Sequence, residues 1–87
     1  MLQLADGYRL RGDTLARNAR QLSEMPQERD YLQRAAEAYR EALARYLSLK
    51  DFSNVVSSIR LVQRSLERVE KRIAEMSNPA ILPPRPQ

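Results

Sequence analysis

The 87 residues allow one small domain, and with 43% of them hydrophobic a core can form. The chain has no cysteine and no histidine, which excludes disulfides, thiolate metal sites and cysteine or histidine catalysis. It has neither an apolar run of ~20 residues nor a signal-peptide pattern, so we expect a cytoplasmic protein. The formal net charge of +4 suits acidic peptides, nucleic acid or anionic lipid as partners without choosing among them.

The first predicted helix covers residues 3–23. Its apolar positions recur at spacings of three and four residues and therefore share one face: Ala5, Tyr8, Gly12, Leu15, Ala19 and Leu22. Gly12 lies on this face, where the missing side chain favours close contact with another helix over a functional role. Asp6 is a candidate N-cap. The pattern predicts an amphipathic helix that packs on a neighbour.

The second predicted helix, residues 26–49, is the one around which we expect the rest to pack. Pro26 suits a first helical turn, and Glu28 meets the positive end of the helix dipole. A wide apolar stripe follows: Leu32, Ala35, Ala36, Tyr39, Ala42, Leu43, Tyr46 and Leu47. A stripe of this width has a neighbour on each flank, so we predict that this helix is the most buried. The short connection before it predicts an antiparallel pair.

The third predicted helix covers residues 53–76. Asp51 or Ser53 is placed to cap it, with Phe52 as a hydrophobic staple over the turn. Its apolar residues alternate at spacings of four and three, which is a heptad seam: Val55, Ile59, Val62, Leu66, Val69, Ile73 and Met76. Such a seam packs on a neighbouring helix of the same chain, and it also suits pairing with a second copy.

Four arginines of this helix recur every fourth residue and form a ridge beside the seam: Arg60, Arg64, Arg68 and Arg72. A ridge of this kind holds phosphates or acidic side chains through bidentate contacts, or it is simply a solvated face partly neutralised by nearby glutamates. Nucleic-acid recognition usually adds base-stacking aromatic residues or a reading helix, and neither is evident.

The composition changes in the C-terminal segment, residues 77–87. Asn78 and Pro79 end the third helix, and the proline-rich remainder predicts an extended, disordered tail. Pro83 and Pro86 have the spacing of an SH3-binding PxxP ligand, but proline-rich linkers are common, so the linker interpretation is favoured.

The predicted fold is therefore all-α: a three-helix antiparallel bundle over residues 3–76, followed by the tail of residues 77–87. Its acidic residues lie mostly beside arginines, and serines such as Ser57 and Ser58 have no base to activate them. We predict no enzymatic activity, no metal and no cofactor.

Two segments carry a resemblance to a known family. The sequence AEAYREALARYL (Ala36–Leu47) resembles the second helix of MIT (microtubule interacting and trafficking) domains, although tetratricopeptide hairpins share part of this pattern. Ser58–Ile73 resembles the third helix of MIT domains, whose L-x-R-x-E order is matched by Leu66, Arg68 and Glu70. The turn before the second helix differs, because the family often has a glycine-polar-tyrosine sequence there.

The resemblance implies an adaptor function. MIT domains bind short, acidic C-terminal motifs of ESCRT-III subunits and so recruit ATPases, proteases or kinases in endosomal trafficking. By this resemblance, a helical or extended peptide is expected in a groove between the second and third helices. The predicted peptide-binding residues are Ala42, Arg45, Tyr46, Leu49, Ile59, Arg64, Leu66, Arg68 and Glu70.

Two other functions stay open at this stage. The heptad seam suits a helical homo-oligomerisation or scaffold module, although we expect a monomer rather than a homodimer. A basic nucleic-acid-binding module is the weaker alternative. The partner peptide and the larger protein to which the domain belongs are not indicated by the sequence.

Overall fold

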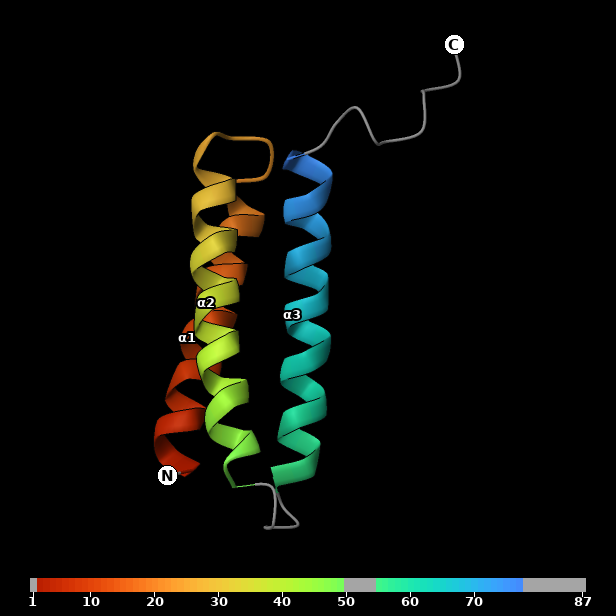
Figure 1. The fold of residues 1–87 in the computed structure, drawn as a ribbon. Coiled ribbons are helices and arrows are strands. Elements are labelled where there is room, and N and C mark those ends of the chain that lie inside the picture. Colours follow the sequence, from red (N-terminus) through yellow and green to blue (C-terminus); the bar gives the residue numbers. More distant parts are fainter. Residues whose placement is uncertain (1, 50–54, 78–87) are drawn as a thin grey trace.

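A computed structural model of the chain describes residues 2–49 and 55–77, which form three helices. They are α1 (Leu2–Gln21), α2 (Gln27–Leu47) and α3 (Val55–Ser77). Helices α1 and α3 run in the same direction, and α2 runs in the opposite direction between them (Figure 1). The predicted all-α, three-helix antiparallel bundle is confirmed, and each helix begins and ends within two residues of its predicted bounds.

Three predictions fall outside the described residues. They are the capping of α3 by Asp51 or Ser53, the staple role of Phe52, and the character of the C-terminal tail.

Helix α2 is the centre of the bundle. Helices α1 and α3 each pack along α2 and touch one another little. The buried residues of α2 outnumber those of either neighbour, as predicted: Glu28, Leu32, Ala35, Ala36, Ala38, Tyr39, Ala42 and Tyr46. The expectation that Leu47 belongs to this core is wrong, because 46% of its surface is exposed.

Small residues bring α1 close to α2. Ala5, Gly12 and Ala19 recur every seventh residue on one face of α1, and all three are buried. A Cβ atom at Gly12 would lie 2.7 Å from the Cδ1 and Cε1 atoms of the Tyr39 ring, well inside van der Waals contact. Gly12 therefore serves the close helix contact that the sequence predicts, because any larger residue would displace the tyrosine.

Two tyrosines of α2 fix the register of α1. The Tyr39 hydroxyl donates a hydrogen bond of 2.6 Å to Asp13, and the Tyr46 hydroxyl donates one to Asp6. Tyr46 lies seven residues after Tyr39, and Asp6 lies seven residues before Asp13. One antiparallel register of α1 on α2 therefore satisfies both hydrogen bonds. Asp6 is therefore not an N-cap: α1 begins at Leu2, and the carboxylate binds a buried tyrosine instead.

The heptad seam of α3 faces α2. Its first, third and fifth positions, Val55, Val62 and Val69, are buried, and the remaining seam residues pack against the same core while partly exposed. Burying this seam stabilises α3 despite the β-branched residues that lower its helix propensity. Within one folded chain the seam is already covered.

Candidate peptide-binding groove

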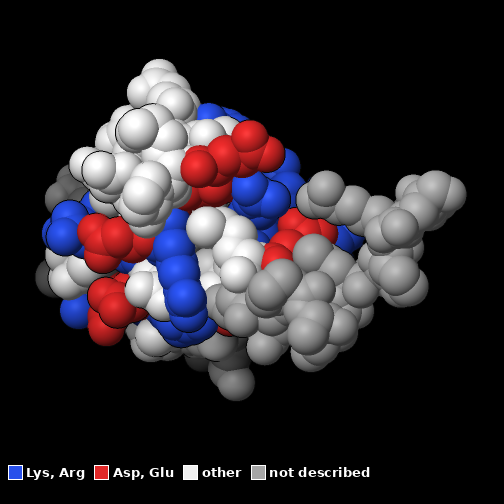
Figure 2. All heavy atoms as spheres, turned by 90° about the horizontal axis from the view of Figure 1, so that it is seen from above, with Lys and Arg blue, Asp and Glu red and all other residues white. Residues whose placement is uncertain are grey.

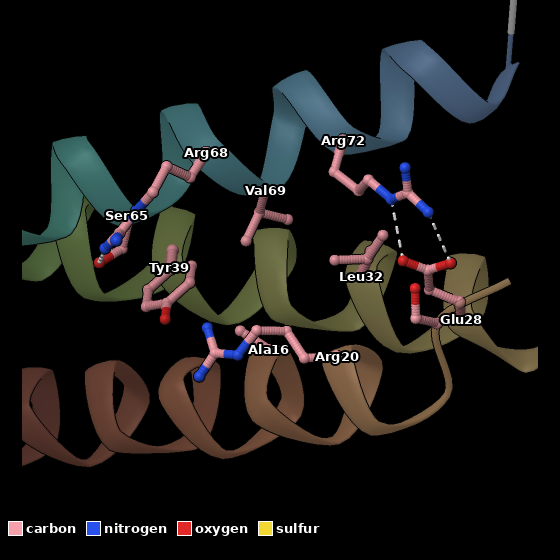
Figure 3. A pocket seen from close by; sticks show the side chains of 10 residues that line it. Ala16, Arg20, Glu28, Leu32, Tyr39, Ser65, Arg68, Val69 and Arg72 are labelled. Carbon is pink, nitrogen blue, oxygen red and sulfur yellow. Dashed lines mark hydrogen bonds and ion pairs between the residues drawn. The ribbon is translucent and has the colours of Figure 1, made fainter.

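A groove separates α1 from α3, because both helices pack on α2 but touch one another little. It holds a cavity of about 480 Å³, with α2 as its floor. Ala16 and Arg20 line the cavity from α1, and Ser65, Arg68 and Arg72 line it from α3 (Figure 3). We call this the α1–α3 groove.

The floor of the α1–α3 groove is apolar. It consists of Leu32 and Tyr39 from α2, with Val69 of α3 beside them, and all three are nearly fully buried. Burial raises the pKa of Tyr39, and its hydrogen bond to Asp13 raises this pKa further, so the ring stays neutral at ordinary pH. A floor of this kind suits an apolar side chain of a partner.

The rims of the groove carry arginines from both sides. Arg20 of α1 extends along the cavity in the direction of Tyr39 (Figure 3). Arg68 of α3 has one weak contact, from Nη2 to the Ser65 hydroxyl at 3.5 Å. Among the residues that the structure describes, neither Arg20 nor Arg68 forms an ion pair with a carboxylate. Both residues are exposed to solvent, and they stand on opposite rims of one cavity without an ion-pair partner among the described residues.

The third arginine is different, because Arg72 pairs with Glu28 of α2 at one end of the groove. Its Nε and Nη2 atoms donate to the two carboxylate oxygens of Glu28 at 2.9 and 3.1 Å (Figure 3). Glu28 is only 4% exposed, and one of its oxygens also accepts the backbone N–H of Glu24 at 2.9 Å. The hydrogen bond from Arg72 holds the pKa of Glu28 below its ordinary value, and the same contact raises the pKa of Arg72.

Glu28 consequently joins three parts of the fold. Glu24, in the turn between α1 and α2, has a φ of 67°, a left-handed conformation that is uncommon outside glycine. Its N–H points to the Glu28 carboxylate, which in turn binds α3 through Arg72. The sequence indicated only the helix-dipole role of Glu28 and missed this pair, whose members are 44 residues apart.

The predicted groove lies on the other side of α3, between α2 and α3. A smaller cavity of about 350 Å³ exists there, lined by Gln33, Ala36, Glu37, Arg40 and Ile73. Arg40 donates to Glu70 at 2.8 Å, so an ion pair crosses from one wall to the other. We call this the α2–α3 groove. Glu70, predicted as a rim residue for a peptide, is occupied by this pair.

The apolar residues among the predicted site residues gather in the core of the bundle and not along a groove. Ala42 and Tyr46 have 0% exposed surface and cannot contact a peptide in this conformation, which corrects their assignment. Arg45 lies on the side of α1, with its guanidinium 5.0 Å from the centroid of the Tyr8 ring. The predicted site residues Leu49, Ile59 and Leu66 are partly buried because they pack against the core.

The arginine ridge of α3 is also divided. All arginines of the ridge except the half-buried Arg72 are exposed, but Arg60 and Arg64 line neither cavity, whereas Arg68 and Arg72 line the α1–α3 groove. A four-residue repeat advances by about 40° per step around a helix, so the ridge moves from solvent into the groove. Of the predicted site residues, only Arg68 lines this groove.

Charges of both signs are intermixed on the end of the bundle that holds the α1–α2 turn (Figure 2). The described residues contain no group of three or more acidic side chains close enough to bind a metal ion. None of the three helices is long and apolar enough to cross a membrane.

No family model matches the chain, and no curated protein or solved structure is significantly similar to it. The resemblance to MIT domains therefore stays a prediction that depends on the residues quoted above.

Proposed function

We propose that the chain is a protein–protein interaction module that binds a short acidic peptide segment, helical or extended, in the α1–α3 groove. The observation that carries this proposal is the apolar floor of Leu32 and Tyr39 between two unpaired arginines, Arg20 and Arg68, that belong to different helices. Such a surface complements a segment that has an apolar side chain flanked by acids.

The binding energy would come from two sources. An apolar side chain placed on the floor leaves water, which contributes about 1.5–3 kcal/mol before the cost of ordering the peptide. Carboxylates of the segment would pair with the two arginines, which sets the direction of the peptide and makes binding weaken as salt rises.

The resemblance to MIT domains supports the same class of function. The acidic tails of ESCRT-III subunits are accordingly the first partners to test, and recruitment in endosomal trafficking is the corresponding role. The groove differs from the one that the resemblance implied, because the Arg40–Glu70 pair crosses the α2–α3 groove.

The two alternative functions receive less support. The seam residues Val55, Val62 and Val69, which would mediate self-association, are buried against α2. A nucleic-acid-binding surface would need exposed aromatic side chains for base stacking, and none of the four tyrosines is fully exposed: Tyr39 and Tyr46 are buried, and Tyr8 and Tyr31 are half-buried.

An array of acidic tail peptides, followed by fluorescence anisotropy with the tightest binder, tests the proposal. Ala16→Glu places a carboxylate in the groove and is expected to weaken binding at least tenfold, since the peptide itself is acidic. Thr14→Glu makes the same charge change at an exposed position of α1 outside the cavity and should stay within about twofold of the wild type. Circular dichroism checks that both variants fold.

The proposal fails if no acidic peptide binds, or if the two variants weaken binding equally. Equal losses would show that only the net charge of the domain matters.

A further inference from the structure

The charges that line the α1–α3 groove do not balance. Three arginines line the cavity, Arg20, Arg68 and Arg72, against one carboxylate, Glu28. Both oxygens of Glu28 are occupied by Arg72, and one of them also accepts the N–H of Glu24. A second carboxylate, that of Glu75, lies 3.9 Å from Nη1 of Arg72. The positive charge of Arg72 is therefore neutralised within the domain.

Two positive charges remain, those of Arg20 and Arg68. The Asp13 carboxylate accepts the Tyr39 hydroxyl on the α1 side and is not among the residues that line the cavity. One partner carboxylate would compensate only one of the two arginines. A phosphomonoester carries about −1.5 to −2 charge at pH 7 and offers three acceptor oxygens, so it matches both.

The shape of the cavity restricts the direction from which a phosphate group can enter it. The arginines stand on opposite rims of a cavity of about 480 Å³ whose floor is α2, so the group must project between α1 and α3. A side chain that branches from a segment lying in the groove can do this. The Ser65 hydroxyl, below Arg68, adds a neutral donor on the same wall.

We propose that the α1–α3 groove receives a phosphorylated serine or threonine side chain of the partner segment, held between Arg20 and Arg68. This inference rests on the proposed function, because it specifies which anionic side chain of the peptide the groove prefers. Phosphorylation of the partner would then strengthen the interaction, since it places a second negative charge on one side chain.

Small probes test the inference without a known partner. N-acetyl-O-phosphoserine methylamide, the matching glutamate amide and inorganic phosphate are titrated into the full chain, and the Nε–Hε signals of the arginines are followed by NMR. The phosphoserine amide should bind about tenfold tighter than the glutamate amide and shift Arg20 and Arg68. It should also bind tighter than inorganic phosphate, because its Cβ methylene group can contact the apolar floor.

The double variant Arg20→Gln/Arg68→Gln should lower the affinity for the phosphoserine amide at least tenfold. Arg17→Gln/Arg64→Gln removes the same charge from exposed positions of the same two helices and should change it by less than twofold. Equal losses in both double variants, or equal affinity for the glutamate and phosphoserine amides, would overturn the inference. Equal affinity for inorganic phosphate would overturn the assignment to a protein side chain.

The inference and the proposed function fail in different ways. If acidic peptides bind and Ala16→Glu removes that binding, while phosphoserine has no advantage over glutamate, only the phosphate inference is wrong. If no peptide binds, phosphorylated or not, the proposed function is wrong as well.

Discussion

The two grooves beside α3 share one helix but differ in how their charges are paired. In the α2–α3 groove the facing charges, Arg40 and Glu70, satisfy one another across the gap. In the α1–α3 groove Arg72 pairs with Glu28 of the α2 floor at one end, and among the described residues Arg20 and Arg68 form no ion pair beside the apolar floor. This difference in pairing is the basis for placing the proposed peptide in the α1–α3 groove.

The same comparison explains why α1 and α3 stay apart. Each is held by α2, α1 through small residues and two tyrosine hydroxyls, and α3 through its valine seam. No comparable apolar seam joins α1 to α3 in the described part of the chain, where these helices touch little. The space between α1 and α3 is therefore lined by side chains from the rims of the groove.

The largest effect is expected from Leu66→Asp. Leu66 packs against the core rather than into a groove, so an aspartate there would bury a charge and lose apolar contacts, at a cost of about 3–5 kcal/mol in the free energy of unfolding. Leu61→Asp is the matched control, because Leu61 is 46% exposed on the same helix and should cost less than about 1 kcal/mol. Urea unfolding followed by circular dichroism measures both. A stable, well-folded Leu66→Asp variant would contradict the placement of Leu66.

The two glycines of α1 should respond with opposite signs. Gly12→Ala forces a methyl group against the Tyr39 ring at 2.7 Å, and overpacking of this kind costs about 1–3 kcal/mol. Gly7→Ala meets no atom within 4 Å and should gain about 1 kcal/mol from helix propensity. Thermal melting distinguishes them. Since Tyr39 is the groove floor, Gly12→Ala should also weaken peptide binding, and a stabilising Gly12→Ala would refute the close contact.

The Glu28–Arg72 pair gives a pH-dependent effect of intermediate size. The pKa of Glu28 is lowered from its ordinary value of 4.5, so its contribution to stability is present above pH 4.5 and is lost as the pH falls through the lower value of the folded state. Glu28→Gln should cost about 1–3 kcal/mol at pH 7 and remove that part of the acid dependence. Glu37→Gln, at an exposed carboxylate, should change neither. Urea unfolding from pH 7 to pH 3 measures both, and parallel curves for wild type and Glu28→Gln would contradict the prediction.

The smallest effect is expected at the ion pair across the α2–α3 groove. Arg40 and Glu70 are both about half exposed, so a double-mutant cycle with Arg40→Gln and Glu70→Gln should give a coupling below about 1 kcal/mol that falls with salt. Peptide binding should not change in either variant. A peptide that binds tighter once this pair is removed would show that the α2–α3 groove is the site.

The sequence predicts the helices and their faces well, because each follows from the spacing of apolar residues along one segment. The central place of α2 and the close contact at Gly12 are confirmed for this reason. The small-residue repeat on α1 likewise follows from local spacing. These features need no knowledge of distant residues.

The groove could not be predicted in the same way. Which side of α3 stays open depends on how α1 is rotated about α2, and this is set by tyrosine–aspartate bonds that join residues 26 and 40 positions apart. The apolar spacing on α2 is equally compatible with Tyr46 lining a groove or lying in the core, and only the packing of the three helices determines which. Arg72 belongs to a ridge that is exposed at Arg60, and the buried Glu28 that pairs with it is 44 residues away.

The most direct test of the central claim is to map a bound acidic peptide onto the domain by amide chemical shifts. With the tightest binder from the peptide array, the account predicts the largest changes along the α1–α3 groove, at Ala16, Arg20, Ser65 and Arg68. Changes should be small at Glu37 and Arg40, which line the other cavity. The reverse pattern, with the largest changes at Glu37 and Arg40, would place the peptide in the α2–α3 groove and contradict the account.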